Sequence, residues 1–180
     1  GGRGVLGQTM RDEDEVVFFA RSNTLATLLF FTDKGKVYSE RVFELPEESR
    51  QGRGIALVNI LNLEPDETVT ALLSVPDFGQ ASYCTMATRR GRVKRIALSE
   101  FASVRPSGLI AIKLDGDDRL GWVCLTKGKD HVLLVTHGGK ALRFPEEEIR
   151  PTGRTTMGVT GIHLRANDGL AAMAVVEQDG

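Results

Sequence analysis

Short apolar runs alternate with glycines and charged residues along the whole chain, in a recurring order. The first recurring pattern is an apolar strand, a glycine turn and a basic strand, at residues 28–38, 85–95 and 133–143. In each copy a glycine follows a threonine by three residues, where the tight turn of a hairpin needs a positive φ. We therefore expect three β-hairpins, with turns at Gly35, Gly91 and Gly139.

Two further patterns accompany the hairpins. An arginine stands shortly before a glycine and an aliphatic residue, and these glycines are 50, 54 and 50 residues apart. They are Gly4, Gly54, Gly108 and Gly158. An acidic turn then leads into an apolar strand, and the acids are Asp14, Asp66, Asp118 and Asp168. The spacing predicts an internal repeat of about fifty residues.

The repeat divides the chain into a half-unit at 1–27 and three full units at 28–78, 79–129 and 130–180, within a single domain over 1–180. Each full unit has room for four short strands, and no stretch keeps a helical period for longer than about two turns. One four-stranded unit cannot cover its own apolar faces, whereas stacked units cover each other's. We expect an all-β fold, a propeller-like disc of four-stranded antiparallel blades.

Composition adds little to this picture. The chain has 180 residues, of which 41% are hydrophobic and 26% charged, as in ordinary globular proteins. No apolar run approaches a membrane span, and the first four residues have no apolar core of a signal peptide, so we expect a cytoplasmic protein with no membrane contact. The chain does not begin with Met, so we interpret it as a fragment or a processed form. Cys84 and Cys124 are expected to be buried free thiols, with a disulfide as the alternative.

The distribution of charge says more than the net charge of −1. Residues 86–105 contain six basic residues and one acid, whereas acids gather at 12–15 and 146–148. Segregation of this kind can place a basic stripe on one surface of a nearly neutral protein.

Several sequence segments together resemble those of a known family, although each segment alone is a weak signal. In chain order they span residues 30–38, 45–50, 86–95, 105–112 and 153–159. Their order and spacing resemble the C-terminal domain of bacterial DNA gyrase A, with the equivalent domain of topoisomerase IV as the close relative. Gly1, Gly2, Arg3 and Gly4 resemble the last four residues of that family's box, Gln-Arg-Arg-Gly-Gly-Lys/Arg-Gly, and the first three box residues are not in this sequence.

The resemblance implies a fold, a function and partners. The fold is a β-pinwheel, in which adjacent blades exchange a strand and five or six blades are typical. Its basic rim binds duplex DNA without sequence specificity and bends it, which directs negative supercoiling by an enzyme that also contains the rest of gyrase A and gyrase B. ATP and Mg act elsewhere in that enzyme, so the resemblance implies no cofactor for this domain. The alternatives are a topoisomerase IV domain and a propeller-type protein-interaction module with no nucleic-acid role.

Basic side chains on an outer rim can neutralise phosphates, with binding that depends strongly on salt. The candidate DNA-binding residues are Arg3, Lys36, Arg41, Arg50, Arg53, Arg89, Arg90, Arg92, Lys94, Arg95, Arg105, Lys140, Arg143, Arg150 and Arg154. The alternative for each is a solvated hairpin charge or an ion pair between blades. Ion pairing is a specific alternative for Arg50 and Arg150, because both stand near runs of glutamate.

No pattern of catalytic or metal-binding residues emerges. Gly1–Gly4 lacks the continuation of a nucleotide-binding loop, and the histidines at 131, 137 and 163 have no partner at metal-ligand spacing. Tyr38 and Tyr83 are expected to be strand aromatics rather than DNA-cleaving nucleophiles, and Trp122 a core residue. We therefore expect no catalytic residue and no metal site in this domain.

Overall fold

The computed structural model describes residues 15–17, 26–41, 54–56, 61–79, 82–105 and 107–177. The strands are β1 (Glu15–Val17), β2 (Thr27–Thr32), β3 (Lys36–Arg41), β4 (Gly54–Ala56), β5 (Val69–Val75), β6 (Tyr83–Thr88), β7 (Arg92–Ala97), β8 (Leu109–Ile110), β9 (Leu120–Thr126), β10 (His131–Thr136), β11 (Ala141–Pro145), β12 (Val159–Thr160) and β13 (Leu170–Val176). Among the described residues, the short 3-10 helices η3 (Leu98–Phe101) and η4 (Glu146–Glu148) follow β7 and β11. In the described part of the chain, no helix is long and apolar enough to cross a bilayer.

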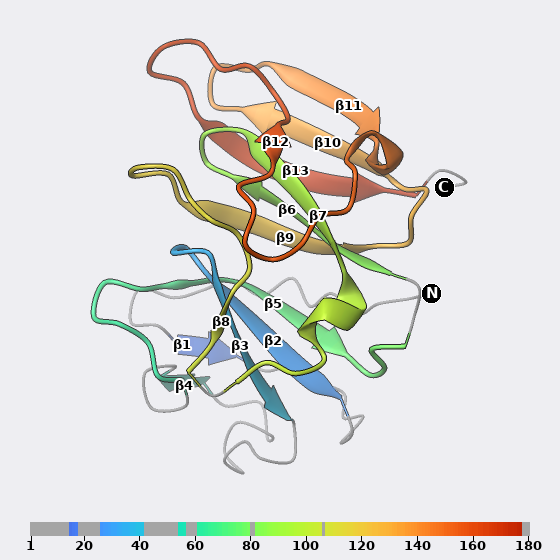
Figure 1. Cartoon of the computed structure of the whole chain (residues 1–180). Helices are drawn as coiled ribbons and strands as arrows, with labels where there is room; N and C mark the ends of the chain where they lie inside the picture. The colour runs from blue at the N-terminus through green and yellow to red at the C-terminus, as the bar shows by residue number, and fades with distance from the viewer. Residues whose placement is uncertain are drawn as a thin grey trace.

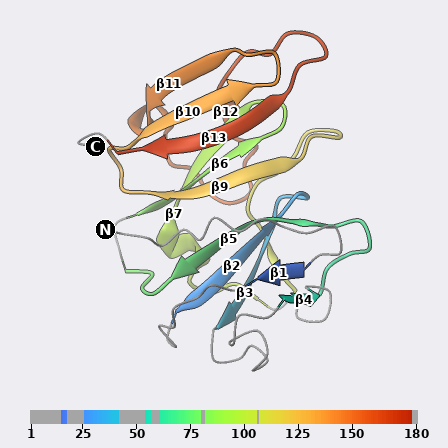
Figure 2. The same cartoon turned by 180° about the vertical axis from the view of Figure 1, so that it is seen from behind.

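Three antiparallel sheets form the body of the molecule and stack on one another (Figure 1). The first sheet has the strand order β5-β2-β3-β8, the second β12-β7-β6-β9 and the third β11-β10-β13. Strands β1 and β4 pair separately. Seen from behind, β5, β9 and β13 lie one above another (Figure 2). Each of these strands forms the corresponding edge of its sheet, so neighbouring sheets contact each other along these edge strands. The expected all-β architecture of four-stranded antiparallel sheets is confirmed.

Neighbouring units exchange a strand. Strand β8 belongs to the second unit of the sequence but pairs with β3 of the first sheet, with Val37 opposite Leu109. Strand β12 of the third unit likewise pairs with β7, with Val93 opposite Val159. Each of the first two sheets is therefore completed by the unit that follows it, and the unit boundaries drawn from the sequence stay a prediction.

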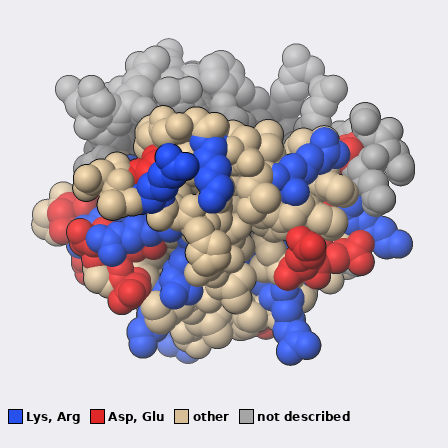
Figure 3. All heavy atoms as spheres, turned by 90° about the horizontal axis from the view of Figure 1, so that it is seen from above, with Lys and Arg blue, Asp and Glu red and all other residues tan. Residues whose placement is uncertain are grey.

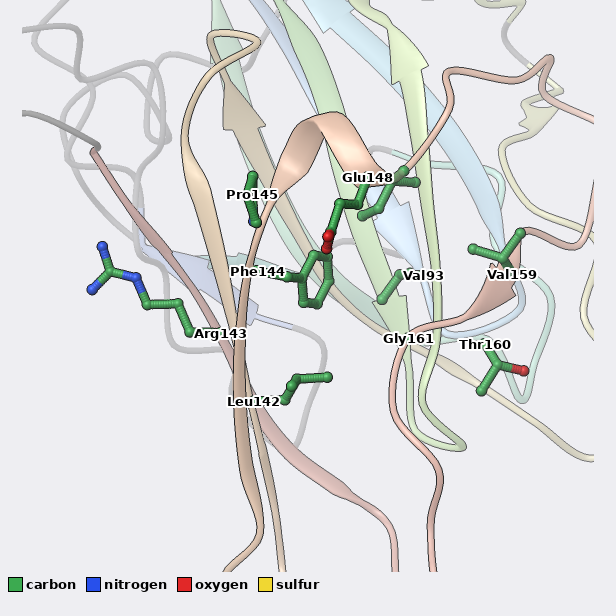
Figure 4. Close-up of a pocket in the computed structure, with 10 residues that line it drawn as sticks. Val93, Leu142, Arg143, Phe144, Pro145, Glu148, Val159, Thr160 and Gly161 are labelled. Atoms are coloured by element: carbon green, nitrogen blue, oxygen red, sulfur yellow. The ribbon is translucent and has the colours of Figure 1, made fainter.

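The edge of the third sheet differs from the other two. Among the described residues no strand pairs with the outer side of β11. Leu142 on β11 is 39% exposed, whereas its repeat equivalents Tyr38 and Lys94 are 2% and 1% exposed. An open cavity of about 390 Å³ lies between β11 and β12 (Figure 4).

The hairpin turns explain the recurring threonine and glycine. In each turn the glycine N–H donates to the threonine carbonyl at 3.0–3.1 Å. The threonine hydroxyl accepts the N–H of the residue after the glycine, at 3.0–3.4 Å. The glycines have φ values of +79°, +88° and +91°, a region that residues with a Cβ rarely adopt. They are Gly35, Gly91 and Gly139.

An acid two residues before the fourth strand of each unit fixes the hairpin turn. Asp118 Oδ1 accepts the N–H of Arg90 at 3.0 Å, and Asp168 Oδ1 accepts that of Gly138 at 2.9 Å. In the first unit the residue at this position is Glu67, not the Asp66 that the sequence suggested. Glu67 is buried, whereas Asp66 is exposed.

The buried apolar residues of the described ranges form three clusters. One lies between the first and second sheets and includes a T-shaped contact between Phe31 and Phe101, with ring centroids 5.7 Å apart. Another lies on the far side of the first sheet, and the third lies between the second and third sheets. Trp122 is partly buried and packs against the third cluster, and Cys84 and Cys124 are free thiols, Cys84 fully buried. The units thus cover each other's apolar faces, as expected.

Candidate nucleic-acid interface

The structure separates the predicted DNA-binding residues by exposure. Arg3, Arg50 and Arg53, and the box residues Gly1, Gly2 and Gly4, lie outside the described residues. The exposed candidates are Arg41, Arg89, Arg90, Arg105, Lys140, Arg143 and Arg150, and the half-buried ones are Lys36, Arg92 and Arg154. Lys94 and Arg95 are buried.

The expectation of a surface position is wrong for Lys94. Its Nζ donates to the carbonyl oxygens of Arg154 at 2.7 Å, Ala111 at 2.8 Å and Thr156 at 2.9 Å. All three ammonium donors are therefore used inside the protein. Burial, and to a smaller extent the charge of Arg154, lowers the pKa of Lys94 to about 8.

The expectation is also wrong for Arg95. Its guanidinium donates to Glu146 Oε1 and to the Ile149 carbonyl, each at 2.9 Å, and lies 4.2 Å from the centre of the Tyr83 ring. Glu146 is fully buried and also accepts the Thr126 hydroxyl at 2.7 Å and the Asp130 N–H at 2.9 Å. This network joins the second unit to the third, so Arg95 is structural.

Both corrections have one physical cause. Strand β7 is an inner strand of its sheet and is packed between neighbouring elements, so side chains on both of its faces are enclosed. Long basic side chains tolerate such positions when their charged ends reach acceptors. The Ala111 carbonyl is 17 positions from Lys94, and the other acceptors come from residues 51 to 62 positions away, distances at which no local pattern can reveal them.

Cations at the first hairpin turn are neutralised by acids of the same unit. Lys34 forms an ion pair with Asp66 at 2.6 Å, and Lys36 with Glu64 at 3.6 Å. At the second turn Arg90 pairs with Asp117, and Arg89 is exposed. Paired cations present less net positive charge to an approaching polyanion than unpaired ones.

Four other cations contact neutral acceptors only. Arg92 donates to the Gly158 carbonyl at 3.1 Å, Arg154 to that of Ile110 at 3.4 Å and Lys140 to that of His163 at 3.0 Å. Arg143 donates to His131 Nδ1 at 3.2 Å. Within the described part of the chain these four have no carboxylate within ion-pair distance, so their charges remain available to an external anion.

Sequence reasoning missed several exposed basic residues in loops, namely Lys113, Lys127, Lys129 and Arg165. Lys127 pairs with Glu177 at 2.7 Å. The repeat itself offered a signal for Lys113, because it stands five residues after Gly108, as His163 does after Gly158. On the face seen from above, basic side chains are spread over uncharged surface and acidic ones gather toward the sides (Figure 3).

The described residues hold little that resembles a catalytic or ligand site. They contain no group of three or more His, Cys, Asp and Glu side chains that could hold a metal ion. In the cavity beside β11, Phe144 and Val93 face each other and Arg143 points to the other side of the strand (Figure 4). The cavity wall is mostly apolar, which suits packing rather than chemistry.

Comparison with known proteins gives a consistent result. A family profile described as "DNA gyrase C-terminal domain, beta-propeller" matches residues 1–23, 26–76, 82–121 and 130–177. The chain is 43% identical to the DNA gyrase A protein of Staphylococcus aureus over 176 residues, which is 97% of this chain and 20% of that protein. It is 39% identical to the Clostridium acetobutylicum gyrase A protein over 161 residues, 89% of this chain and 19% of that protein.

Solved structures show the same relationship. The crystal structure of the C-terminal domain of DNA topoisomerase IV matches 94% of this chain and 53% of that chain, with a TM-score of 0.81 and 32% identity. The structure of a DNA gyrase A C-terminal domain matches 97% of this chain and 56% of that one, with a TM-score of 0.71 and 24% identity, which supports the fold. The chain spans about a fifth of the length of the curated relatives it matches.

Proposed function

The chain belongs to the DNA gyrase C-terminal domain family, and from that premise we propose that it binds duplex DNA through the phosphate backbone and bends it around its basic surface. In this proposal the domain works within gyrase A, beside gyrase B, as part of an ATP-dependent type II topoisomerase in the cytoplasm. The domain itself carries no catalytic residue and needs no cofactor, because it contributes only the path that the DNA follows.

The observation that carries the proposal is the set of cations with neutral partners. Arg92, Lys140, Arg143 and Arg154 each donate to a carbonyl or an imidazole nitrogen, and no described carboxylate neutralises them. Acidic residues elsewhere keep the net charge at −1, so these charges act locally rather than through the charge of the whole chain. Contacts of this kind position DNA without reading its sequence.

A salt titration tests the binding. Fluorescence anisotropy with a labelled linear duplex of about 40 base pairs gives the affinity between about 50 and 200 mM salt. With four phosphate contacts, affinity falls by on the order of 100-fold over this range, because each neutralised phosphate releases about 0.9 counterion. No binding at 50 mM salt, or an affinity independent of salt, would contradict the proposal.

Matched variants show whether the unpaired cations carry the binding. We expect Lys140→Gln and Arg143→Gln to weaken binding similarly on unrelated DNA sequences and to reduce the salt slope by about one each. Lys127→Gln is the control, because Lys127 already pairs with Glu177. An equal loss in the control would indicate an effect of net charge alone.

Bending needs a separate measurement. A relaxed circular plasmid is incubated with the chain and a type I topoisomerase, and the linking number is measured after the protein is removed. A shift that grows with protein concentration supports wrapping. An unchanged linking number at saturating protein would limit the proposal to binding without wrapping.

A further inference from the structure

Two basic side chains of the second unit reach one short loop of the third unit, and a third basic side chain extends from that loop back to the second unit. Arg92 and Lys94 are two residues apart on β7, so their side chains leave the strand on the same face. Both reach residues 154–158, Arg92 at the Gly158 carbonyl and Lys94 at the carbonyls of Arg154 and Thr156. Arg154, from that loop, reaches back to the second unit at the Ile110 carbonyl.

The charges of this cluster are not balanced by acids. Among the described residues, none of the three cations has a carboxylate within ion-pair distance. The equivalent positions in the first unit differ, because Lys36 pairs with Glu64 and Tyr38 replaces Lys94 with a neutral side chain bonded to Glu67. Arg95, which adjoins the cluster in sequence, is balanced by Glu146.

Like charges held together without a counter-ion raise the energy of the folded chain. The effect is visible in Lys94, because the charge of Arg154 acts together with burial to lower its pKa. An anion bound beside Arg154 would offset this repulsion between Arg154 and Lys94. Guanidinium groups suit phosphate, because their planar forks donate two parallel hydrogen bonds to its oxygens.

We propose that Arg92 and Arg154, supported from below by Lys94, form a binding subsite for one phosphate group of a nucleic-acid backbone. Lys94 makes no contact with the phosphate. It fixes the 154–158 loop through two of its carbonyls and adds positive potential from a buried position. This subsite rests on the proposed function, since it assigns one defined phosphate contact to the DNA path.

The first test uses inorganic phosphate and the 180-residue chain. Amide spectra of ¹⁵N-labelled protein are recorded during a phosphate titration at constant ionic strength. We expect saturable shifts for Gly158 and Thr156 that are lost in Arg92→Gln/Arg154→Gln. The control Lys34→Gln/Lys127→Gln removes two charges that acids already neutralise and keeps the shifts.

The second test measures DNA affinity for the same proteins. The Arg92→Gln/Arg154→Gln variant should bind a labelled duplex on the order of tenfold more weakly at low salt, with a salt slope smaller by about two. Equal affinity and slope in this variant and the wild type would overturn the subsite, while the proposed DNA binding would stand. Loss of DNA binding by the wild type, with the phosphate shifts retained, would overturn the proposed function and leave an anion site.

Two further outcomes are decisive. Poly-glutamate that produces the same shifts as phosphate at equal charge would assign the cluster to protein carboxylates and overturn the proposal. If the double variant loses its far-UV circular dichroism, Arg154→Gln alone replaces it, because that side chain makes only a 3.4 Å contact. Unchanged phosphate shifts in this single variant would likewise overturn the proposal.

Discussion

The buried carboxylate of Glu146 offers the most demanding test of how the units are joined. It accepts hydrogen bonds from the Arg95 guanidinium, the Thr126 hydroxyl and the Asp130 N–H, and it has no exposed surface. Replacement of Glu146 by alanine leaves a buried guanidinium without its counter-ion and the Asp130 N–H without its carboxylate acceptor.

The expected cost follows from that geometry. Breaking a buried ion pair by removing one partner costs about 3–5 kcal/mol. For a chain of this size each kcal/mol lowers Tm by about 2–4 °C, so Glu146→Ala should lower Tm by about 6–20 °C. The adjacent Glu147 is exposed, and Glu147→Ala should stay within about 0.5 kcal/mol of the wild type.

Urea unfolding followed by far-UV circular dichroism and by the fluorescence of Trp122 measures both variants. A second substitution sharpens the test. If the cost of Glu146→Ala comes from the unpaired charge, adding Arg95→Met should restore part of the lost stability, because the charge is then removed as well. A Glu146→Ala variant within about 1 kcal/mol of Glu147→Ala, or a double variant less stable than Glu146→Ala, would refute this reasoning.

Three other predictions concern single positions. In urea unfolding, Gly35→Ala should lower the free energy of unfolding by about 3 kcal/mol or more, and Gly139→Ala by about 1–2 kcal/mol. Both glycines have a positive φ, but of the two only a Cβ at position 35 would collide with a backbone oxygen, that of Ile112. Equal costs for the two variants would contradict this reasoning. The pKa of Lys94 is lowered to about 8 from 10.5, so the unfolded chain binds more protons between these values. The contribution of Lys94 to stability should therefore rise with pH across that window, measured as the difference in the free energy of unfolding between the wild type and Lys94→Met at each pH. Burial raises the pKa of the Cys84 and Cys124 thiols, so both should react with a disulfide reagent at pH 8 far more slowly in the native than in the denatured chain, and rapid native labelling would contradict their placement.

The hairpins were predictable because their signals are local. A threonine and a glycine three residues apart specify the turn through hydrogen bonds within it, so the sequence alone predicts each turn. The acidic turns are nearly as local, yet the pattern pointed to Asp66 rather than Glu67. Two adjacent acids precede that strand, and only the structure shows which one reaches Tyr38.

The exchange of strands came from the family resemblance rather than from any pattern. Strands β8 and β12 are two residues long, and such short strands give no sign of which sheet they join. The burial of the β7 side chains was equally impossible to predict from a local sequence pattern. Lys94 and Arg95 look like surface residues in sequence, and only their distant acceptors show them to be interior.

No described strand pairs with the outer edge of β11, and this has a consequence for how such a chain is made. Each of the first two sheets receives its last strand from the unit that follows, so when the units are synthesised in order a sheet stays incomplete until the next unit has been made. Truncation is then asymmetric. Removing a unit from the C-terminal side leaves the preceding sheet one strand short, whereas removing one from the N-terminal side takes away a neighbouring sheet and leaves the remaining sheets with all their strands. A nascent chain of this kind needs its edge strand protected until the next fifty or so residues have left the ribosome.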